Sequence, residues 1–256
     1  MQEKILLGKN ILITGTNRGM GKQMLQTFAE NGANIFAHAR KHTVEHENFC
    51  SDIAEANSVK IIPVYFEITS QEEIKRGVQE IRATKLPVTG LVNNAGIIYN
   101  ALFQMTNIAE VRKQFEVNFF APFLLTQYIS KLMVRNQIGS IVNISSSVAI
   151  DGNSGKSAYG SSKAALICMT KCIAEELGSF GIRANAICPS VTETDMLSDM
   201  SEEVLNLQLK STFLGKLGKP IDIANTAMFL LSDRSSYITG QIFRVDGGIT
   251  EHYKRK

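Results

Sequence analysis

Short apolar runs alternate with amphipathic segments from one end of the chain to the other. The runs are rich in Ile, Val, Leu and Ala, and several are almost continuously apolar. Parallel strands that are covered on both faces have this composition. The pattern predicts seven strands, over Asn10–Thr14, Asn34–His38, Lys60–Phe66, Leu91–Asn93, Ser140–Ile144, Ala184–Cys188 and Ile242–Val245.

Helical patterns fill the gaps between these runs. Ser70, with Glu73 three residues later, has the form of a capping box that opens a helix. Pro220 with Asp222 suits the first turn of another helix. No Pro-, Gly- or Ser-rich linker divides the chain. The alternation over residues 1–256 therefore predicts a single α/β domain, a doubly wound parallel sheet of about seven strands with helices on both faces and right-handed crossovers.

The composition is that of an ordinary globular protein. Of the 256 residues, 44% are hydrophobic and 20% are charged, and the formal net charge is +3. This balance predicts no nucleic-acid or membrane partner. The apolar stretch Phe119–Leu125 is shorter than the ~20 residues that span a bilayer, and the run Ile5–Leu7 is too short for a signal peptide. We therefore expect a cytoplasmic protein.

Neither the cysteines nor the histidines predict a metal site. The four cysteines form no C-x-x-C pair, and Cys168 and Cys172, on a predicted helix, are expected at buried core positions. His42, Glu45 and His46 match a zinc-hydrolase pattern. That pattern also needs a third ligand and a catalytic cleft, whereas this segment follows the second predicted strand. We expect it to hold no metal.

A glycine-rich loop joins the first predicted strand to a helix that begins near Lys22. Glycines there let the chain turn sharply and let backbone N–H groups approach a pyrophosphate. Three residues separate Gly15 from Gly19, so the spacing is not G-x-G-x-x-G, and an ordinary glycine-rich turn is the alternative. In a Rossmann-like fold the candidate cofactor-binding residues of this loop are Gly15, Asn17, Arg18, Gly19, Met20 and Gly21.

The end of the second predicted strand distinguishes NAD from NADP. A site for NAD usually has an acidic residue there, about 20 residues after the glycine loop. This chain has Ala39 followed by Arg40, and Arg18 lies in the loop. Guanidinium groups can bind a 2′-phosphate, although the same arginines could simply be solvated. The residues therefore favour NADP(H) as the cofactor.

Tyr159 and Lys163 stand at the beginning of another predicted helix. Their spacing of four residues places the phenol and the ammonium on one helix face. A free tyrosine has a pKa of about 10, and a nearby cation brings the phenol closer to useful acid–base strength. Alone, the pair is equally typical of a solvated helix face. Ser146 follows the fifth predicted strand and Asn94 the fourth, at the sheet edge where doubly wound folds bind ligands.

Taken together, these features resemble the short-chain dehydrogenase/reductase family over nearly the whole chain, and within it the 3-oxoacyl-acyl-carrier-protein reductases of fatty acid biosynthesis. The matching segments are Thr14–Gly21, Asn93–Gly96, Asn118, Ser146, Tyr159 with Lys163, Gly181–Asn185, Pro189–Thr194, Ser236–Gly240 and Val245–Gly248. The resemblance implies NADPH-dependent reduction of a ketone to a secondary alcohol. The implied substrate is a 3-oxoacyl thioester, free or carried on acyl carrier protein. A reductase or dehydrogenase of a sugar, polyol or other secondary alcohol is the alternative.

The same resemblance implies roles for four catalytic residues. Tyr159 donates a proton to the carbonyl oxygen, and Ser146 orients that oxygen. Lys163 binds the nicotinamide ribose and lowers the pKa of Tyr159, and Asn118 holds a water that relays protons. The complete set argues against a third possibility, a dinucleotide-binding protein without catalysis.

Further cofactor contacts are implied beyond the glycine loop and Arg40. They flank the adenine, pass beside its ribose, or line the nicotinamide. In chain order these residues are Glu67, Ile68, Asn94, Ala95, Gly96, Tyr159, Lys163, Pro189, Thr192 and Thr194.

Some residues depart from the family pattern. Ser190 stands where the family usually has glycine, so the backbone beside the nicotinamide has less freedom. Phe180 and Gln137 stand where carrier-protein reductases often have basic docking residues, with Arg135 one turn away. Substrate choice is expected to reside in a lid over Val191–Leu217. The apolar residues of that lid are Met196, Met200, Val204 and Leu205.

A homotetramer is the implied assembly. The apolar stripes of Phe115–Leu132 and Ala164–Leu177 are wider than packing on one sheet face requires. The aromatic residues over Phe115–Phe123 are typical of a core helix or a helix at a subunit interface.

Overall fold

A parallel sheet of seven strands forms the centre of the protein in the computed structural model, which describes residues 3–194, 203, 206 and 209–249. The order across the sheet is β3-β2-β1-β4-β5-β6-β7, and every neighbouring pair is parallel. The strands are β1 (Asn10–Thr14), β2 (Asn34–Ala39), β3 (Ile61–Tyr65), β4 (Gly90–Asn93), β5 (Gly139–Ile144), β6 (Ile182–Pro189) and β7 (Ile242–Val245).

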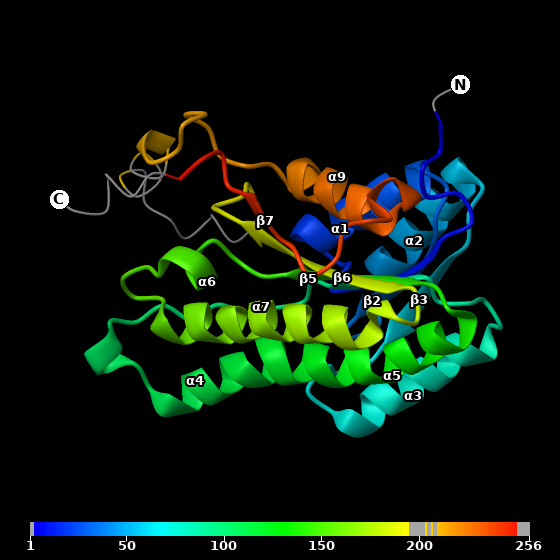
Figure 1. Ribbon diagram of the computed structural model, residues 1–256, viewed down its shortest axis with the longest axis horizontal. Coiled ribbons are helices and arrows are strands. Elements are labelled where there is room, and N and C mark those ends of the chain that lie inside the picture. Colours follow the sequence, from blue (N-terminus) through cyan, green and yellow to red (C-terminus); the bar gives the residue numbers. More distant parts are fainter. Residues whose placement is uncertain (1–2, 195–202, 204–205, 207–208, 250–256) are drawn as a thin grey trace.

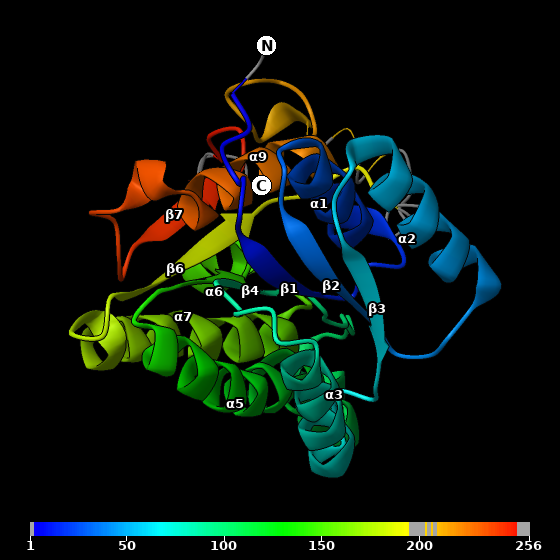
Figure 2. The ribbon, with the colours of Figure 1, turned by 90° about the vertical axis from the view of Figure 1, so that its right-hand side faces the viewer.

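Helices cover both faces of the sheet, as Figure 1 and Figure 2 show. One face carries α1 (Gly19–Glu30), α2 (Val44–Asn57) and α9 (Pro220–Leu231), and the other carries α3 (Gln71–Ala83), α5 (Ala121–Asn136) and α7 (Ser157–Gly178). Two shorter helices, α4 (Ile108–Phe115) and α6 (Val148–Asp151), lie on the side of α7. The predicted doubly wound α/β fold is therefore confirmed. No helix among the described residues is long and apolar enough to cross a bilayer.

The core has two parts because side chains alternate across the sheet. Ile11 and Ile13 of β1 pack with Phe28 of α1 on one face. Leu12, between them in sequence, packs with Ile129 of α5 on the other face. All five side chains are fully buried. Burial on both faces explains why the strands read as continuous apolar runs rather than as alternating ones.

The predicted strand bounds hold to within one residue except at β6, which begins two residues before the predicted Ala184. The early part of β6 contains Arg183, a charged residue that an apolar pattern excludes. Its guanidinium donates to the carbonyl oxygens of Leu230 at 2.8 Å and Ser232 at 3.2 Å. These bonds satisfy the buried end of the side chain, so the strand can extend through it.

Both predicted helix starts are present, with one difference in detail. The Ser70 hydroxyl accepts from the N–H of Glu73 at 3.3 Å, but the Glu73 carboxylate accepts from the N–H of Glu67 at 2.8 Å. Only half of the capping box forms, because the Ser70 N–H donates to the Glu67 carbonyl oxygen. At α9, Pro220 occupies the first turn and Asp222 accepts from the Lys219 N–H at 2.7 Å.

Two predictions about the helices are wrong. Cys168 and Cys172 are exposed rather than buried, because the buried face of α7 runs through Leu166, Met169 and Thr170 instead. The long helix predicted around Asn118 is divided by a π-helical turn over Glu116–Phe120. Pro122 gives the physical reason, since it has no N–H to donate to the Asn118 carbonyl oxygen, as a regular α-helix would require.

Candidate active site

The carboxyl ends of β1 and β4 form the centre of the candidate site. The chain runs outward from β1 to β3 and then crosses to β4 on the other side of β1. The connections after β1 and β4 therefore lead away in opposite directions, and doubly wound sheets bind ligands at such a switch point. The predicted glycine loop follows β1, and Asn94–Gly96 follows β4.

Close packing explains the glycines of the loop. Gly15 and Gly19 have positive φ angles of 74° and 53°, a conformation that favours glycine. A Cβ atom on Gly21 would clash with the Gly15 carbonyl oxygen, so the first turn of α1 packs on the loop only because residue 21 is glycine. That first turn contains no acidic residue, and Arg18 precedes it. This helix N-terminus therefore suits an anionic group such as a pyrophosphate.

The remaining loop residues and Arg40 differ in their exposure. Asn17, Arg18 and Arg40 are exposed, while Met20 is partly buried against the core. Arg40 follows β2 directly. In the described part of the chain neither arginine has an ion-pair partner, so both guanidinium groups are available to a phosphate.

Thr14 and Asn94 hold the loops after β1 and β4 together. The Thr14 hydroxyl accepts from the N–H groups of Asn94 at 2.9 Å and Ala95 at 3.0 Å. The Asn94 amide donates to the carbonyl oxygens of Thr14 at 2.8 Å and Gly15 at 3.2 Å. The side chain of Asn94 thus supports the glycine loop, and its own contact with a cofactor stays a prediction.

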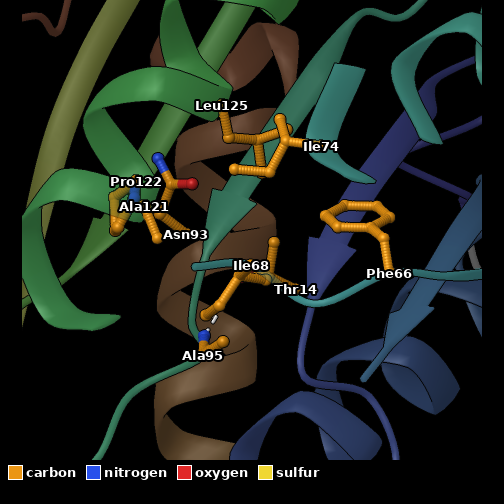
Figure 3. Close-up of a pocket in the computed structure, with 9 residues that line it drawn as sticks. All are labelled: Thr14, Phe66, Ile68, Ile74, Asn93, Ala95, Ala121, Pro122 and Leu125. Atoms are coloured by element: carbon orange, nitrogen blue, oxygen red, sulfur yellow. Dashed lines mark hydrogen bonds between the residues drawn. The ribbon is translucent and has the colours of Figure 1, made fainter. Parts of the chain in front are cut away.

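A small pocket opens at this junction (Figure 3). Its lining residues are Thr14, Phe66, Ile68, Ile74, Asn93, Ala95, Ala121, Pro122 and Leu125. Ile68 and Ala95, both predicted near the adenosine of the cofactor, line the same pocket, whose wall is largely apolar. Glu67 is not part of the lining, and its carboxylate accepts from the N–H of Thr69 at 3.2 Å.

Lys163 is buried at the carboxyl edge of the sheet. Its ammonium donates to the Ile144 carbonyl oxygen at 2.8 Å. A Cβ atom on Gly96 would lie 3.3 Å from this ammonium and 3.1 Å from the side-chain oxygen of Asn118, so three predicted site residues meet here. Desolvation lowers the pKa of Lys163 to about 8, because burial penalises the charged form.

Tyr159 lies one helical turn before Lys163, near the beginning of α7, and forms a hydrogen bond with Ser146 from the loop after β5. Desolvation raises the pKa of Tyr159 above its ordinary value, and the bond with Ser146 lowers it by a smaller amount. The predicted net lowering of this pKa is therefore wrong for this structure. Burial outweighs the hydrogen bond with Ser146, and the ammonium of Lys163 donates to the Ile144 carbonyl oxygen.

Asn118 is fully buried in the π-helical turn. Its side chain accepts from the N–H of Ile97 at 2.9 Å and donates to the Ile97 carbonyl oxygen at 2.9 Å. It also donates to the Ser162 hydroxyl at 3.1 Å, which joins the loop after β4 to α7. Ser162 was not predicted as a site residue, although it directly precedes Lys163. The water predicted at Asn118 stays a prediction.

The residues predicted around the nicotinamide lie at the end of β6 or shortly after it. The Pro189 carbonyl oxygen accepts from the N–H of Ser147 at 2.9 Å, and Thr192 is buried with its hydroxyl bonded to the Ser190 carbonyl oxygen at 3.1 Å. The methyl group of Thr194 would lie 3.6 Å from a Cβ atom on Gly19, so Thr194 approaches the glycine loop.

Ser190 has no positive φ angle, so a serine adopts its backbone conformation without strain. Of the predicted lid, the apolar residues Met196, Met200, Val204 and Leu205 lie outside the described residues.

An ion-pair network beside the site was not predicted. Arg244 in β7 binds both carboxylate oxygens of Asp151 in α6, at 2.8 and 2.6 Å, and the carboxylate of Asp246 at 2.6 Å. We call these three residues the β7 clamp. It ties α6, which follows Ser146, to the last strand. Arg244 and Asp246 were a visible charge pair in the sequence, but no local signal connects either with Asp151, which lies 93 residues before Arg244.

Several known proteins are similar to this chain in sequence and in fold. A sequence-family model described as enoyl-(acyl carrier protein) reductase matches residues 15–250. The 3-oxoacyl-[acyl-carrier-protein] reductase of Thermotoga maritima is 38% identical, covering 95% of this chain and 98% of the relative, and the L-xylulose reductase of Caenorhabditis elegans is 35% identical, covering 95% and 96%. A 3-oxoacyl-[acyl-carrier protein] reductase from Brucella melitensis with bound NAD has a TM-score of 0.88 at 29% identity, covering 96% of this chain and 93% of that one. In sequence and in fold, the chain belongs to the short-chain dehydrogenase/reductase family, whose members are oxidoreductases that use a nicotinamide dinucleotide.

Proposed function

We propose that this protein reduces a ketone to a secondary alcohol with NADPH, and that its substrates are 3-oxoacyl thioesters. The observation that carries the proposal is the convergence of Ser146, Tyr159 and Lys163 at the carboxyl edge of the sheet. This group lies near the glycine loop, and the helix N-terminus that follows the loop suits an anionic group such as a pyrophosphate. Relatives named as 3-oxoacyl-[acyl-carrier-protein] reductases support the choice of substrate.

Tyr159 acts as the general acid in this proposal. NADPH, when bound, supplies the hydride that reaches the carbonyl carbon. The carbonyl oxygen then needs a proton, and the phenol carries one at neutral pH because desolvation raises the pKa of Tyr159. Ser146 bonds to the phenol and, when substrate is bound, to the carbonyl oxygen, so it sets their relative orientation.

Lys163 provides the positive charge near the phenol. With a pKa of about 8 the ammonium is charged at neutral pH, so it stabilises the phenolate that remains after proton transfer. An ammonium has three N–H donors, and Ile144 uses one of them. The other two can bind the ribose hydroxyl groups of the cofactor. Asn118, 3.1 Å from Ser162, lies where a water could pass protons on from this group.

The preference for NADPH rests on Arg18 and Arg40. Both are exposed, without ion-pair partners among the described residues, and β2 ends in the neutral Ala39. Wild-type kcat/KM should be clearly higher with NADPH than with NADH. Arg40→Asp should raise the KM for NADPH and reduce this preference, because a carboxylate repels a 2′-phosphate. Equal wild-type kcat/KM with the two cofactors would contradict the assignment, and Arg82→Asp, on the remote helix α3, is the matched control.

The substrate class is tested by a reduction screen with acetoacetyl thioesters, keto-sugars and simple ketones. The highest kcat/KM should be obtained with a thioester. The relative named L-xylulose reductase makes a sugar the second candidate, and a clear preference for a keto-sugar would establish it in place of the thioester. Docking of acyl carrier protein would use the exposed Arg135 together with Ile138 and Phe180, whose side chains are 40% and 42% exposed.

A further inference from the structure

A histidine in β2, His38, contacts the glycine loop through its side chain. The His38 ring is buried and packs on Phe66, with 4.1 Å between ring centroids. Its Nε2 lies 2.9 Å from the Phe66 carbonyl oxygen, and its Nδ1 lies 3.3 Å from the N–H of Gly15. A carbonyl oxygen only accepts and a backbone N–H only donates, so the ring is neutral, with its proton on Nε2. Burial, which lowers the pKa of His38 to about 4, keeps it in this state.

A second histidine extends the contact to the next residue of the loop. His46, from α2, is 4% exposed, and its Nε2 lies 2.8 Å from the Thr16 hydroxyl. Its Nδ1 lies 3.2 Å from the hydroxyl of Tyr65 at the end of β3. Thr16 is fully buried, and its hydroxyl also lies 3.1 Å from the His38 carbonyl oxygen. A continuous row of polar groups therefore runs from β3 through α2 to the glycine loop.

The other two residues of the zinc-hydrolase pattern are more exposed than His46. His42 and Glu45 are exposed, and His42 pairs with Glu47 at 2.9 Å. The described residues contain no group of three His, Cys, Asp or Glu side chains that could hold a metal ion. The rings of His42 and His46 both pack edgewise on Tyr65, but among the described residues only His46 bonds to Thr16, which makes His42 a matched control for the contact with the loop.

We infer that His46 is a positioning residue for the cofactor: through Thr16 it fixes the backbone of the glycine loop and so sets dinucleotide affinity without entering the chemical step. The inference rests on the proposed function in one respect, that this loop binds a dinucleotide. Gly15 and Thr16 begin the turn and donate their own N–H groups to the His38 carbonyl oxygen at 2.9 Å, so the N–H groups that would face the pyrophosphate belong to the residues after them. A loop that is already in its binding conformation loses less freedom on binding, so releasing it weakens affinity.

The test compares replacements that fill the same space but bond differently. His46→Leu removes the hydrogen bonds to Thr16 and Tyr65 and the weaker contact with the Cys50 thiol at 3.8 Å. His46→Gln places an amide near the position of Nε2, facing Thr16, whereas His46→Asn places one near Nδ1, facing Tyr65. One neutral hydrogen bond corresponds to about a tenfold change in affinity at most. The dissociation constant for NADPH, by fluorescence titration, should rise about tenfold in His46→Leu and His46→Asn. It should stay near wild type in His46→Gln and His42→Gln.

Measurements of kcat distinguish a residue that positions the loop from one whose loss damages the whole structure. At saturating NADPH, kcat for the best ketone should stay within about twofold of wild type in every variant, because His46 does not touch the reacting atoms. Thr16→Val should weaken NADPH binding as His46→Leu does, and the double variant should be no weaker, since both remove one shared contact. Thermal melting without cofactor records any loss of stability.

Two results would overturn the inference. If His46→Leu melts at a lower temperature but keeps its NADPH affinity, His46 merely packs the core. If His46→Leu does not fold, equal NADPH affinities in His46→Gln and His46→Asn would likewise show that His46 does not position the loop. A wild-type protein that binds neither NADPH nor NADH would refute the proposed function as well, so the two failures are distinguishable.

Discussion

Desolvation has opposite chemical effects on the two titrating residues of the site. It raises the pKa of Tyr159, which favours the protonated phenol, and lowers that of Lys163 to about 8, which favours the neutral amine. At neutral pH the phenol therefore holds a proton while the amine is still charged. This combination suits ketone reduction, which consumes a proton at the carbonyl oxygen.

Loss of the Tyr159 hydroxyl should nearly abolish turnover. Tyr159→Phe keeps the ring in α7 but removes the proton donor, and general acid–base catalysis contributes about 10²–10⁴-fold. We expect kcat to fall by at least about 10²-fold, with the dissociation constant for NADPH within about threefold of wild type. Steady-state kinetics and fluorescence titration measure the two quantities. A variant that retained a tenth of wild-type kcat would show that another group donates the proton.

The charge on Lys163 should set the alkaline limit of activity. As pH rises through the pKa of about 8, Lys163 loses its proton, so kcat/KM for reduction should fall above that pH. This ratio reports ionisation of the free enzyme. Lys163→Arg should be slower at neutral pH but should lack this fall, because a guanidinium stays charged throughout the range. An identical alkaline limb in the variant would assign the titration to a different group.

At the residue scale, the sequence predicted which side chains meet but not how they titrate. The spacing of Tyr159 and Lys163 placed them on one helix face, and the structure brings Gly96, Asn118 and Lys163 together. The direction of the Tyr159 pKa shift was wrong because it depends on how much water reaches the phenol. That quantity is set by elements distant in the sequence. For the same reason, the sequence did not predict that Arg183 belongs to β6 or that Cys168 is exposed.

At the scale of elements, the fit between α1 and the glycine loop is the most constrained contact of the site. Gly21 lies against Gly15 and the amide of Asn94, which itself joins the loops after β1 and β4. One helix turn, one loop and one neighbouring strand end are thus held in a single arrangement. A change at Gly21 reaches all three.

Replacing Gly21 by alanine should therefore separate these elements. Gly21→Ala adds a methyl group that clashes with the Gly15 carbonyl oxygen, so we expect a lower melting temperature and loss of most NADPH affinity. Gly178→Ala is the control, because a Cβ atom there meets nothing within 4 Å at the end of α7. Thermal melting with and without NADPH measures both effects. Similar melting curves for the two variants would mean that the loop can shift to accommodate the methyl group.

The sequence predicted every strand but only part of the helical detail. Apolar runs located the strands because burial on both faces leaves a strong signal. The π-helical turn at Asn118 was missed, although Pro122 was a visible warning that the helix could not continue regularly. The half-formed capping box depended on Glu67, which lies outside the motif.

At the scale of the whole molecule, the pairing of β1 with β4 organises the site. Thr14 contacts residues about 80 positions away, such as Val92 and Asn94. Hydrophobic patterns do not indicate which strands are neighbours. The resemblance to a family therefore contributed more to the predicted site than periodicity did.

The exposed aromatic residues of the π-helical turn and α5 should be covered in a homotetramer. Phe120 and Phe123 are 51% and 43% exposed, and Phe119 packs against both. A contiguous apolar surface of this kind marks an interaction site. Multi-angle light scattering should give four times the chain mass, and Phe120→Arg with Phe123→Arg should give smaller species. Arg substitution at the exposed Leu7, remote from α5, is the control, and a monomeric wild type would contradict the prediction.

The β7 clamp has a consequence for how the protein is made. A ribosome releases Ser146, Tyr159 and Lys163 long before Arg244, and until then the ion pair that holds α6 against the last strand cannot form. A nascent chain can thus contain every catalytic residue while α6 still lacks its ion pair with the last strand. The strand that is synthesised last therefore also completes the surroundings of α6.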